Sequence, residues 1–145
     1  MPSAIQIASS ASRPVWIRDV DSARQPFQTA AAITVPAGQL LGNGQLTTVP
    51  KGQRLVIEYV SAWISLPAGQ RIVQLVMQSP VGTVSHYFTP TLLATNGPVD
   101  LFSVSQPLRL YANPEQQVLG ALSRTGTAGS ATMYLSVSGY MVDVP

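Results

Sequence analysis

His86 is the only histidine of the chain, so a Ser-His-Asp triad or an imidazole acid or base would have to use it. Its neighbours in the sequence are Ser85 and Tyr87, and strand periodicity places it on one face with Val84 and Phe88. A single histidine on an apolar strand face is typical of a packed side chain. No serine stands in the Gly-x-Ser-x-Gly pattern of a nucleophile elbow. The sequence therefore predicts a protein that is not an enzyme, and a hydrolase that uses His86 or Glu58 is the less favoured alternative.

The chain has only six carboxylates, which limits acid-base and metal chemistry. A glycosidase needs two carboxylates at a defined separation, and a calcium site needs several oxygen ligands. Asp19 and Asp21 could contribute to a calcium site, but Arg18 and Arg24 flank them and offer local partners. We therefore expect these four residues to form a surface ion-pair cluster, and we expect no metal and no other cofactor.

Glu58 is the carboxylate with the most unusual surroundings. Strand periodicity places it on an apolar face with Val56 and Val60, and a buried carboxylate has to be paired or protonated. Arg71 or Arg109 could supply the opposite charge. We expect a structural ion pair that fixes strand register or a subunit contact.

Aromatic side chains are a further group with chemical potential, because they can stack on the rings of a sugar. Aromatic platforms beside neutral polar groups suit uncharged glycans. A ligand or partner surface would draw on six residues: Trp16, Trp63, Tyr87, Tyr111, Tyr134 and Tyr140. A carbohydrate-binding sandwich is one function that the sequence leaves open.

Charge is scarce throughout the chain. Charged residues make up 10% and hydrophobic residues 46%, against about a quarter charged in an average domain. A chain with so few charges lacks the repulsion that keeps small domains apart, so we expect copies to associate. The eight basic residues are scattered, which argues against nucleic-acid binding, and the absence of cysteine excludes disulfides. The main prediction is a self-assembling structural or attachment module, with another protein or a glycan as a further partner.

We expect strands to position the candidate histidine, carboxylate and aromatic side chains. Runs of Val, Ile, Leu and Tyr with period two indicate these strands. The pentapeptide [Val/Leu]-Pro-[Ala/Lys]-Gly-Gln occurs at 35–39, 49–53 and 66–70 and predicts type I turns with proline in the second position. The stretches 42–44 and 126–129 are interpreted as turns too. We expect no helix, and strands over 15–20, 27–35, 54–64, 71–78, 83–89, 101–104, 108–111, 117–124 and 131–144.

Two of these strands have informative faces. In 54–64, Leu55, Ile57, Tyr59 and Trp63 share one face and the other face is apolar as well, so we expect a central strand covered on both sides. In 131–144 an apolar face lies opposite a face of hydroxyls and tyrosines. That second face suits either a wet interface or binding groove, or a sheet face in solvent.

Together these patterns predict one domain over 1–145, an antiparallel β-sandwich of about 8–10 strands with jelly-roll topology, and an N-terminal arm over about 1–12. The start of the chain lacks a basic region followed by an apolar core, and no run reaches about 18 apolar residues. We expect neither a signal peptide nor a membrane span. Synthesis in the cytoplasm, with incorporation into a virion or another large assembly, fits these expectations.

The segment Ser138-Gly139-Tyr140-Met141-Val142 follows a Leu-x-Leu-Tyr strand at 108–111 and a glycine-rich loop. This combination resembles the closing strands of the tumour-necrosis-factor and complement-globular-head jelly rolls. The resemblance implies a compact trimer that binds partners. The opening stretch 15–28 is similar to small uncharacterised bacterial β-proteins, which implies a bacterial or phage source and no activity.

Overall fold

The computed structural model describes residues 4–8, 14–18 and 23–145, with side chains described in 23–81 and 83–145. Strands β1 (Ala4–Ala8) and β2 (Pro14–Arg18) pair with each other in antiparallel fashion. A 3₁₀ turn, η1 (Val81–Thr83), precedes β7. The remaining strands are β3 (Gln25–Val35), β4 (Leu41–Thr48), β5 (Gln53–Pro67), β6 (Ile72–Ser79), β7 (Val84–Phe88), β8 (Thr91–Asn96), β9 (Val99–Ala112), β10 (Gln117–Arg124) and β11 (Ala131–Asp143).

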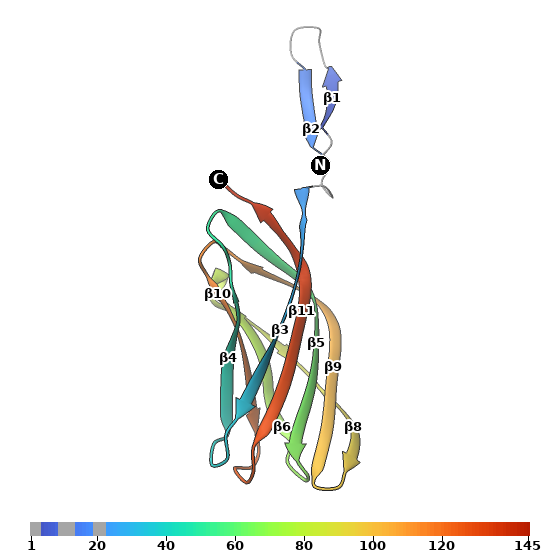
Figure 1. The fold of residues 1–145 in the computed structure, drawn as a ribbon, viewed down its shortest axis with the longest axis vertical. Helices are drawn as coiled ribbons and strands as arrows, with labels where there is room; N and C mark the ends of the chain where they lie inside the picture. The colour runs from blue at the N-terminus through green and yellow to red at the C-terminus, as the bar shows by residue number, and fades with distance from the viewer. Residues whose placement is uncertain (1–3, 9–13, 19–22) are drawn as a thin grey trace.

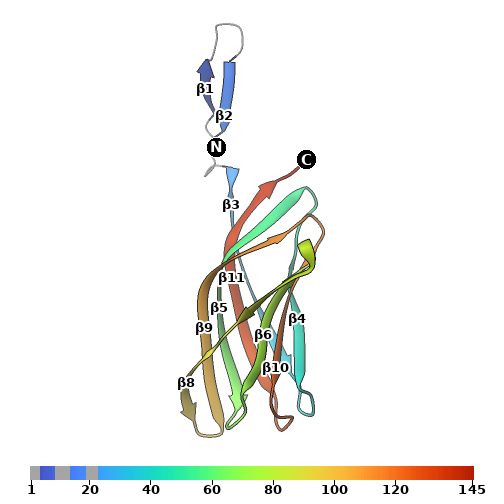
Figure 2. The same ribbon diagram turned by 180° about the vertical axis from the view of Figure 1, so that it is seen from behind.

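These strands form two antiparallel sheets that face each other (Figures 1 and 2). The five-stranded sheet has the order β3-β11-β5-β9-β8, and the four-stranded sheet has the order β4-β10-β6-β7. The predicted all-β sandwich is therefore confirmed. No helix among the described residues is long and apolar enough to cross a bilayer.

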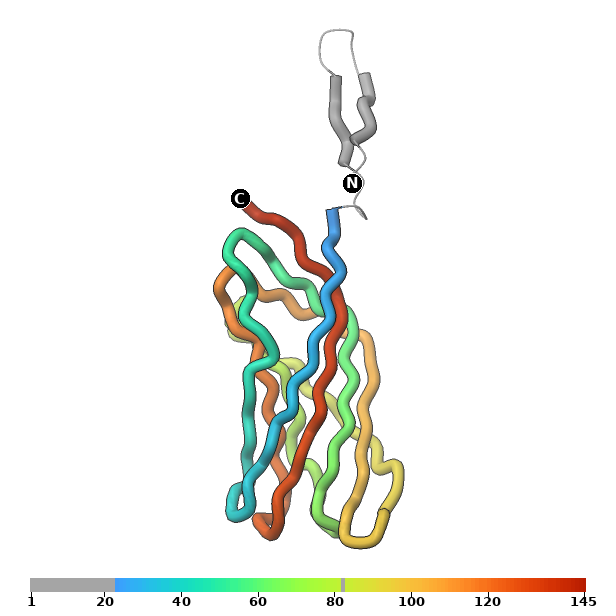
Figure 3. Tube along the Cα trace, in the orientation of Figure 1, coloured from blue at the N-terminus to red at the C-terminus, as the bar shows by residue number. Residues whose placement is uncertain are grey.

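The core fills the space between the two sheets because alternate side chains of each strand point inward. The five-stranded sheet contributes Ile64 and Leu135, and the four-stranded sheet contributes Leu75, Met77 and Leu122, each with 0 or 1% of its surface exposed. Turns that follow β3, β5, β8 and β10 gather at one end of the sandwich, opposite the C-terminus (Figure 3). We call this the loop end.

The three pentapeptides do form turns, but of a different type from the one expected. The carbonyls of Pro36, Pro50 and Pro67 accept hydrogen bonds from the N–H three residues later, at 3.1, 3.2 and 3.1 Å. Proline is thus the first turn residue and glycine the third. The glycines have φ of 87°, 77° and 86°, and the residue before each has negative φ. This combination defines a type II turn, whose third position requires positive φ and so favours glycine.

The prediction of a turn at 42–44 is wrong, because these residues lie inside strand β4. The glycines are needed there for packing. A Cβ atom on Gly42 would lie 2.4 Å from the carbonyl oxygen of Thr34, and one on Gly44 would lie 3.0 Å from the side chain of Ile33. Glycine lets β4 approach β3 closely. A pair of nearby glycines usually indicates a turn, but in β4 it indicates tight packing.

Strand β9 runs without interruption through Pro107, although the sequence predicted two separate strands. Its pairing with β8 ends at Ser103, so Pro107 lies where β9 has a neighbour only on the β5 side. Proline lacks an N–H and is tolerated at such an edge position. Strand β8 itself was not predicted. All six of its residues are exposed, which leaves no buried face to produce a periodic pattern.

Strand β5 is central in its sheet, as expected, but the second sheet packs against only one of its faces. Its pairing shifts at Glu58. Ile57 pairs with Gly139 of β11 and Tyr59 pairs with Ser138, so Glu58 is an extra residue relative to β11. A bulge of this kind reverses the alternation of faces. Ile57 therefore points into the core, whereas Tyr59 and Trp63, expected on the same face as Ile57, point outward with 43% and 46% of their surfaces exposed.

Candidate functional site

The outer side of the five-stranded sheet carries a continuous uncharged surface, which we call the neutral face. The segments 28–34, 59–65, 101–107 and 132–138 contain no Asp, Glu, Lys or Arg. Strand pairing places their outward positions side by side in rows across the sheet. The neutral face consists of Gln28, Ala30, Ala32, Thr34, Tyr59, Ser61, Trp63, Ser65, Leu101, Ser103, Ser105, Pro107, Thr132, Tyr134, Ser136 and Ser138.

One row of the neutral face is an aromatic ridge, formed by Trp63 and Tyr134. Tyr134 pairs directly with Trp63 across β11 and β5, and the row continues to Ala32 on β3 and Ser103 on β9. Tyr134 is 58% exposed and Trp63 46%. Cross-strand aromatic neighbours support each other's orientation. The sheet thus presents two adjacent rings to solvent with small residues on both sides.

The next row is a trough of small residues, formed by Ala30, Ser136 and Ser61. A hollow of about 480 Å³ lies over this row and is also lined by Gln28, Tyr59 and Ser138. The phenol of Tyr59 is hydrogen-bonded to the Ser105 hydroxyl, which closes the trough on the β9 side. The trough is bounded by Tyr59 along one side and by the aromatic ridge along the other.

Glu58 lies just beyond Tyr59, where a second hollow of about 340 Å³ is lined by Pro26, Gln28, Glu58 and Ser138. The side chain of Glu58 is 41% exposed and its Oε2 is 3.6 Å from Nη2 of Arg109. Of the two arginines proposed as its partner, Arg109 is the one nearby. The carboxylate is not buried as expected, because the bulge places it at the sheet surface.

Tyr111 and Tyr140 extend the aromatic surface beyond Glu58, on either side of Val56. The guanidinium of Arg24 lies 4.4 Å from the centre of the Tyr140 ring, a cation–π contact. Tyr111, through hydrogen bonding and its charge, raises the pKa of Arg109, and Glu58 adds a smaller effect in the same direction. This end of the sheet carries charges, which separates it from the neutral face.

The other predicted site residues lie elsewhere. Tyr87 is 65% exposed on the outer side of the four-stranded sheet, so it cannot act with Trp63 and Tyr134. Trp16 and Arg18 belong to β2, but their side chains lie outside the described residues, as do Asp19 and Asp21 entirely. The expected cluster of Arg24 with the two aspartates therefore has no structural description.

His86 lies at the side of the sandwich, in a hollow of about 340 Å³ lined by Ser79, Val81, Val84, Arg109, Leu110 and Tyr111. Its neighbours there are mostly apolar, as the sequence led us to expect. Among the described residues, no group of three or more His, Cys, Asp or Glu side chains is placed to hold a metal ion.

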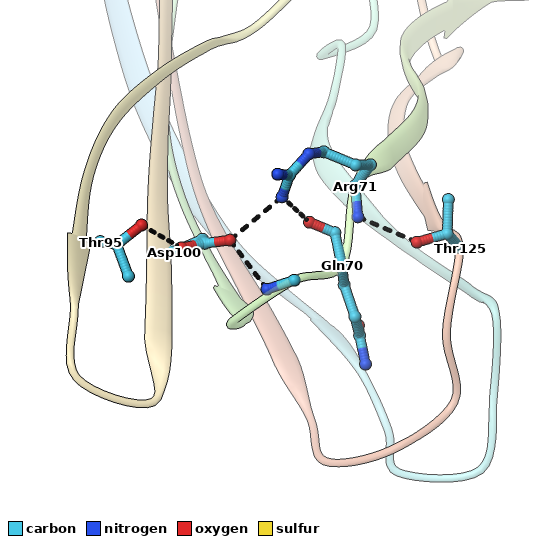
Figure 4. Close-up of polar contacts among 6 residues, drawn as sticks. Gln70, Arg71, Thr95, Asp100 and Thr125 are labelled. Atoms are coloured by element: carbon cyan, nitrogen blue, oxygen red, sulfur yellow. Dashed lines mark hydrogen bonds and ion pairs between the residues drawn. The ribbon is translucent and has the colours of Figure 1, made fainter.

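Asp100 organises polar contacts at the loop end (Figure 4). Its side chain is 4% exposed and accepts hydrogen bonds from the Thr95 hydroxyl at 2.6 Å, the Gly69 N–H at 3.0 Å and Nη1 of Arg71 at 3.1 Å. The bond from Thr95, then the bond from Gly69, and then Arg71 lower the pKa of Asp100, while burial opposes them. The contacts join β8 and β9 to the turn after β5, a structural role that the sequence did not reveal.

Arg124 is the other residue that sequence reasoning missed. It is 2% exposed, although arginine is rarely buried. Its guanidinium donates to the carbonyls of Pro36, Gln39, Ala128 and Gly129 at 2.7 to 3.3 Å and to the side chain of Gln70. The contacts join the turns after β3, β5 and β10. The available signal was the alternation of β10, which places residue 124 on the inward face with Leu122.

No known protein family, curated protein or solved structure matches this chain.

Proposed function

We propose that the protein is a non-enzymatic assembly module whose copies associate through the neutral face. The observation that carries the proposal is the exposed Trp63–Tyr134 pair at the centre of a sheet surface without charges. Interface cores are depleted in charged residues and enriched in aromatic ones, and tryptophan and tyrosine are over-represented among the residues that contribute most to binding.

The size of the neutral face also supports self-association. Seven residues per strand and four strands span about 23 Å by 19 Å, or about 440 Å² of flat area per copy. Two copies would bury about 880 Å² of flat area together, which is close to the roughly 1,000 Å² expected of a biological interface and suits a weak, reversible association. A second copy is the partner that matches this surface in area and in lack of charge.

A charge inserted into the neutral face tests the proposal. We expect Ser61→Lys to prevent association, because the ammonium group would be desolvated opposite an uncharged surface. The matched control is Ser123→Lys, at an outward position of β10 on the other sheet, which should leave association intact. Light scattering after size exclusion over a dilution series measures the mass. A monomeric wild-type protein at all concentrations would refute the proposal.

We further propose that the sandwich is a jelly roll. The strand orders β3-β11-β5-β9 and β4-β10-β6-β7 support this classification, because successive strands alternate between the sheets except at the β6–β7 and β8–β9 pairs, and the first and last sandwich strands are neighbours. Two interlocked Greek keys produce such an order. The trimer and the bacterial or phage source implied by resemblance stay predictions.

Carbohydrate binding is the second candidate function, favoured by the polar lining of the two adjoining hollows. Tyr59 provides a ring, and Gln28, Ser138 and Glu58 provide hydrogen-bonding groups beside it. Such a combination suits a neutral sugar. Titration of the protein with a panel of oligosaccharides at millimolar concentration, followed by amide NMR shifts, tests this candidate. Shifts confined to β3, β5 and β11 would support it, and an unchanged spectrum would rule it out.

A further inference from the structure

We infer that two copies pair face to face about a twofold axis, with the aromatic ridge of each copy seated in the small-residue trough of the other. The inference rests on the proposed function and specifies its geometry. The observation behind it is that the ridge and the trough are adjacent rows of the same strands, β5 and β11.

Adjacent rows make the surface self-complementary. A twofold axis that runs across the strands, between the row of Ser61 and Ser136 and the row of Trp63 and Tyr134, exchanges the two rows. Trp63 of one copy then faces Ser61 of the second copy, and Tyr134 faces Ser136. The same contacts occur twice, as an isologous interface requires. Strands of the two copies lie aligned to within about 30°, as in other stacked sheets.

The shape of the trough fits the ridge. Its hollow of about 480 Å³ is larger than one indole and one phenol ring together, and it has no charged lining residue. The serine hydroxyls on its floor offer hydrogen-bond partners to the indole N–H and the phenol O–H, which usually find such partners when buried. The hydrogen-bonded Tyr59 and Ser105 close the β9 side, so the seated rings are confined on that side.

An isologous face of this kind closes with two copies. Trimers use heterologous contacts, in which two different patches meet, whereas here one patch meets itself. The inference therefore predicts a dimer and conflicts with the trimer implied by the jelly-roll resemblance. A solution mass of three copies would overturn the inference and would leave the self-assembly proposal intact.

Filling the trough tests the contact directly. Ser136→Phe adds apolar surface, so it should strengthen a nonspecific hydrophobic association, but it occupies the place of the partner's ring. We expect the dimer dissociation constant to rise about tenfold or more. Ser123→Phe on the outer side of the four-stranded sheet is the matched control and should leave the constant unchanged. Far-UV circular dichroism and the unfolding midpoint establish that each variant folds. Undiminished association of folded Ser136→Phe would overturn the inference.

Thiol crosslinking tests the axis without removing any aromatic ring, because the chain has no cysteine of its own. Ala32 lies in the ridge row and Ala30 in the trough row, and both are exposed on β3. The axis places Ala30 of one copy opposite Ala32 of the other. Stacked sheets lie about 10 Å apart, which is too far for a direct disulfide. A mixture of the single variants Ala30→Cys and Ala32→Cys, treated with a bis-maleimide crosslinker that spans about 10 Å, should form a linked dimer faster than either variant alone.

The outcomes of the crosslinking experiment separate the two proposals. A linked species that requires the mixture supports the twofold arrangement. Equal linking of each variant alone, or no linking in a mixture that is dimeric by light scattering, overturns the arrangement while self-assembly stands. A mixture that is monomeric by light scattering refutes the proposed function itself.

Discussion

Arg124 and Gln70 meet inside the loop end, where Nη1 of Arg124 donates a hydrogen bond to Oε1 of Gln70 at 3.1 Å. Both residues are buried, at 2% and 9% exposure. No carboxylate is among the partners of Arg124 in the described part of the chain; carbonyl and amide oxygens surround its charge instead. Five oriented dipoles thus replace the counterion that a buried cation usually has.

This arrangement predicts that loss of the guanidinium is costly. Arg124→Leu should lower the free energy of unfolding by about 3–5 kcal/mol, because the carbonyls that it contacts lose their donors. Urea denaturation measures the change. Arg54→Leu removes an exposed arginine with one hydrogen bond to Asn113 and should cost less than about 1.5 kcal/mol. Equal losses of unfolding free energy in the two variants would show that the contacts of Arg124 with the three turns do not stabilise the fold.

The lowered pKa of Asp100 predicts that this residue contributes to stability in a pH-dependent way. Its pKa is lower in the folded state than in the unfolded chain, so the contribution is complete above the ordinary aspartate value of about 3.9 and is lost as the pH falls through the lowered value. Asp100→Asn should reduce stability at neutral pH and flatten its decline below that value. Thr95→Val should flatten the decline partly, since Thr95 is the main cause of the shift. Urea midpoints between pH 2 and 7 measure both effects, and an unchanged slope in Asp100→Asn would contradict the assignment.

The close approach of Gly42 to Thr34 predicts that this position of β4 requires glycine. Gly42→Ala should destabilise the fold by about 1–3 kcal/mol, because its Cβ would collide with the backbone of Thr34. Gly38→Ala is a useful comparison, since space around Gly38 is open and only its φ of 87° is unfavourable. We expect that variant to cost about 1 kcal/mol. Thermal unfolding distinguishes the two, and a smaller loss at Gly42 would contradict the packing argument.

The position of Trp63 on the neutral face predicts that its fluorescence emission reports assembly. In a Trp16→Phe background Trp63 is the only tryptophan, and burial of its ring against a second copy should shift its emission to shorter wavelength. Dilution through the dissociation constant should then move the emission to longer wavelength, in step with the fall in mass. Emission that stays constant while the mass halves would place the interface away from the neutral face.

Much of the sandwich could be predicted because its strands have one buried face. Strand β10 was predicted with the bounds that it has, since its inward side chains alternate strictly with outward ones. Strand β8 has no buried face and β4 contains glycines at tight contacts, so neither produced a strand pattern. An apolar alternation appears where large apolar side chains are buried along one face; β8 has no buried residue, and in β4 glycine occupies the buried position 42.

The candidate site could be predicted only in part. Trp63 and Tyr134 were among the expected binding residues, but their cross-strand pairing depends on the register of β5 and β11, which are distant in sequence. The role of Tyr59 depends on the bulge at Glu58, which no local signal marks. Asp100 and Arg124 draw their partners from several turns, and contacts of that kind follow from the tertiary fold alone.

The three copies of the repeated pentapeptide make different contacts. At 36–39 and 67–70 it supplies oxygens to the buried Arg124, whereas at 50–53 it is a corner whose Gln53 makes only exposed contacts with Gln25 and Asp143. For loop engineering, the three copies are therefore not interchangeable. A tag or a grafted peptide belongs at Lys51, where a longer loop disturbs no buried charge.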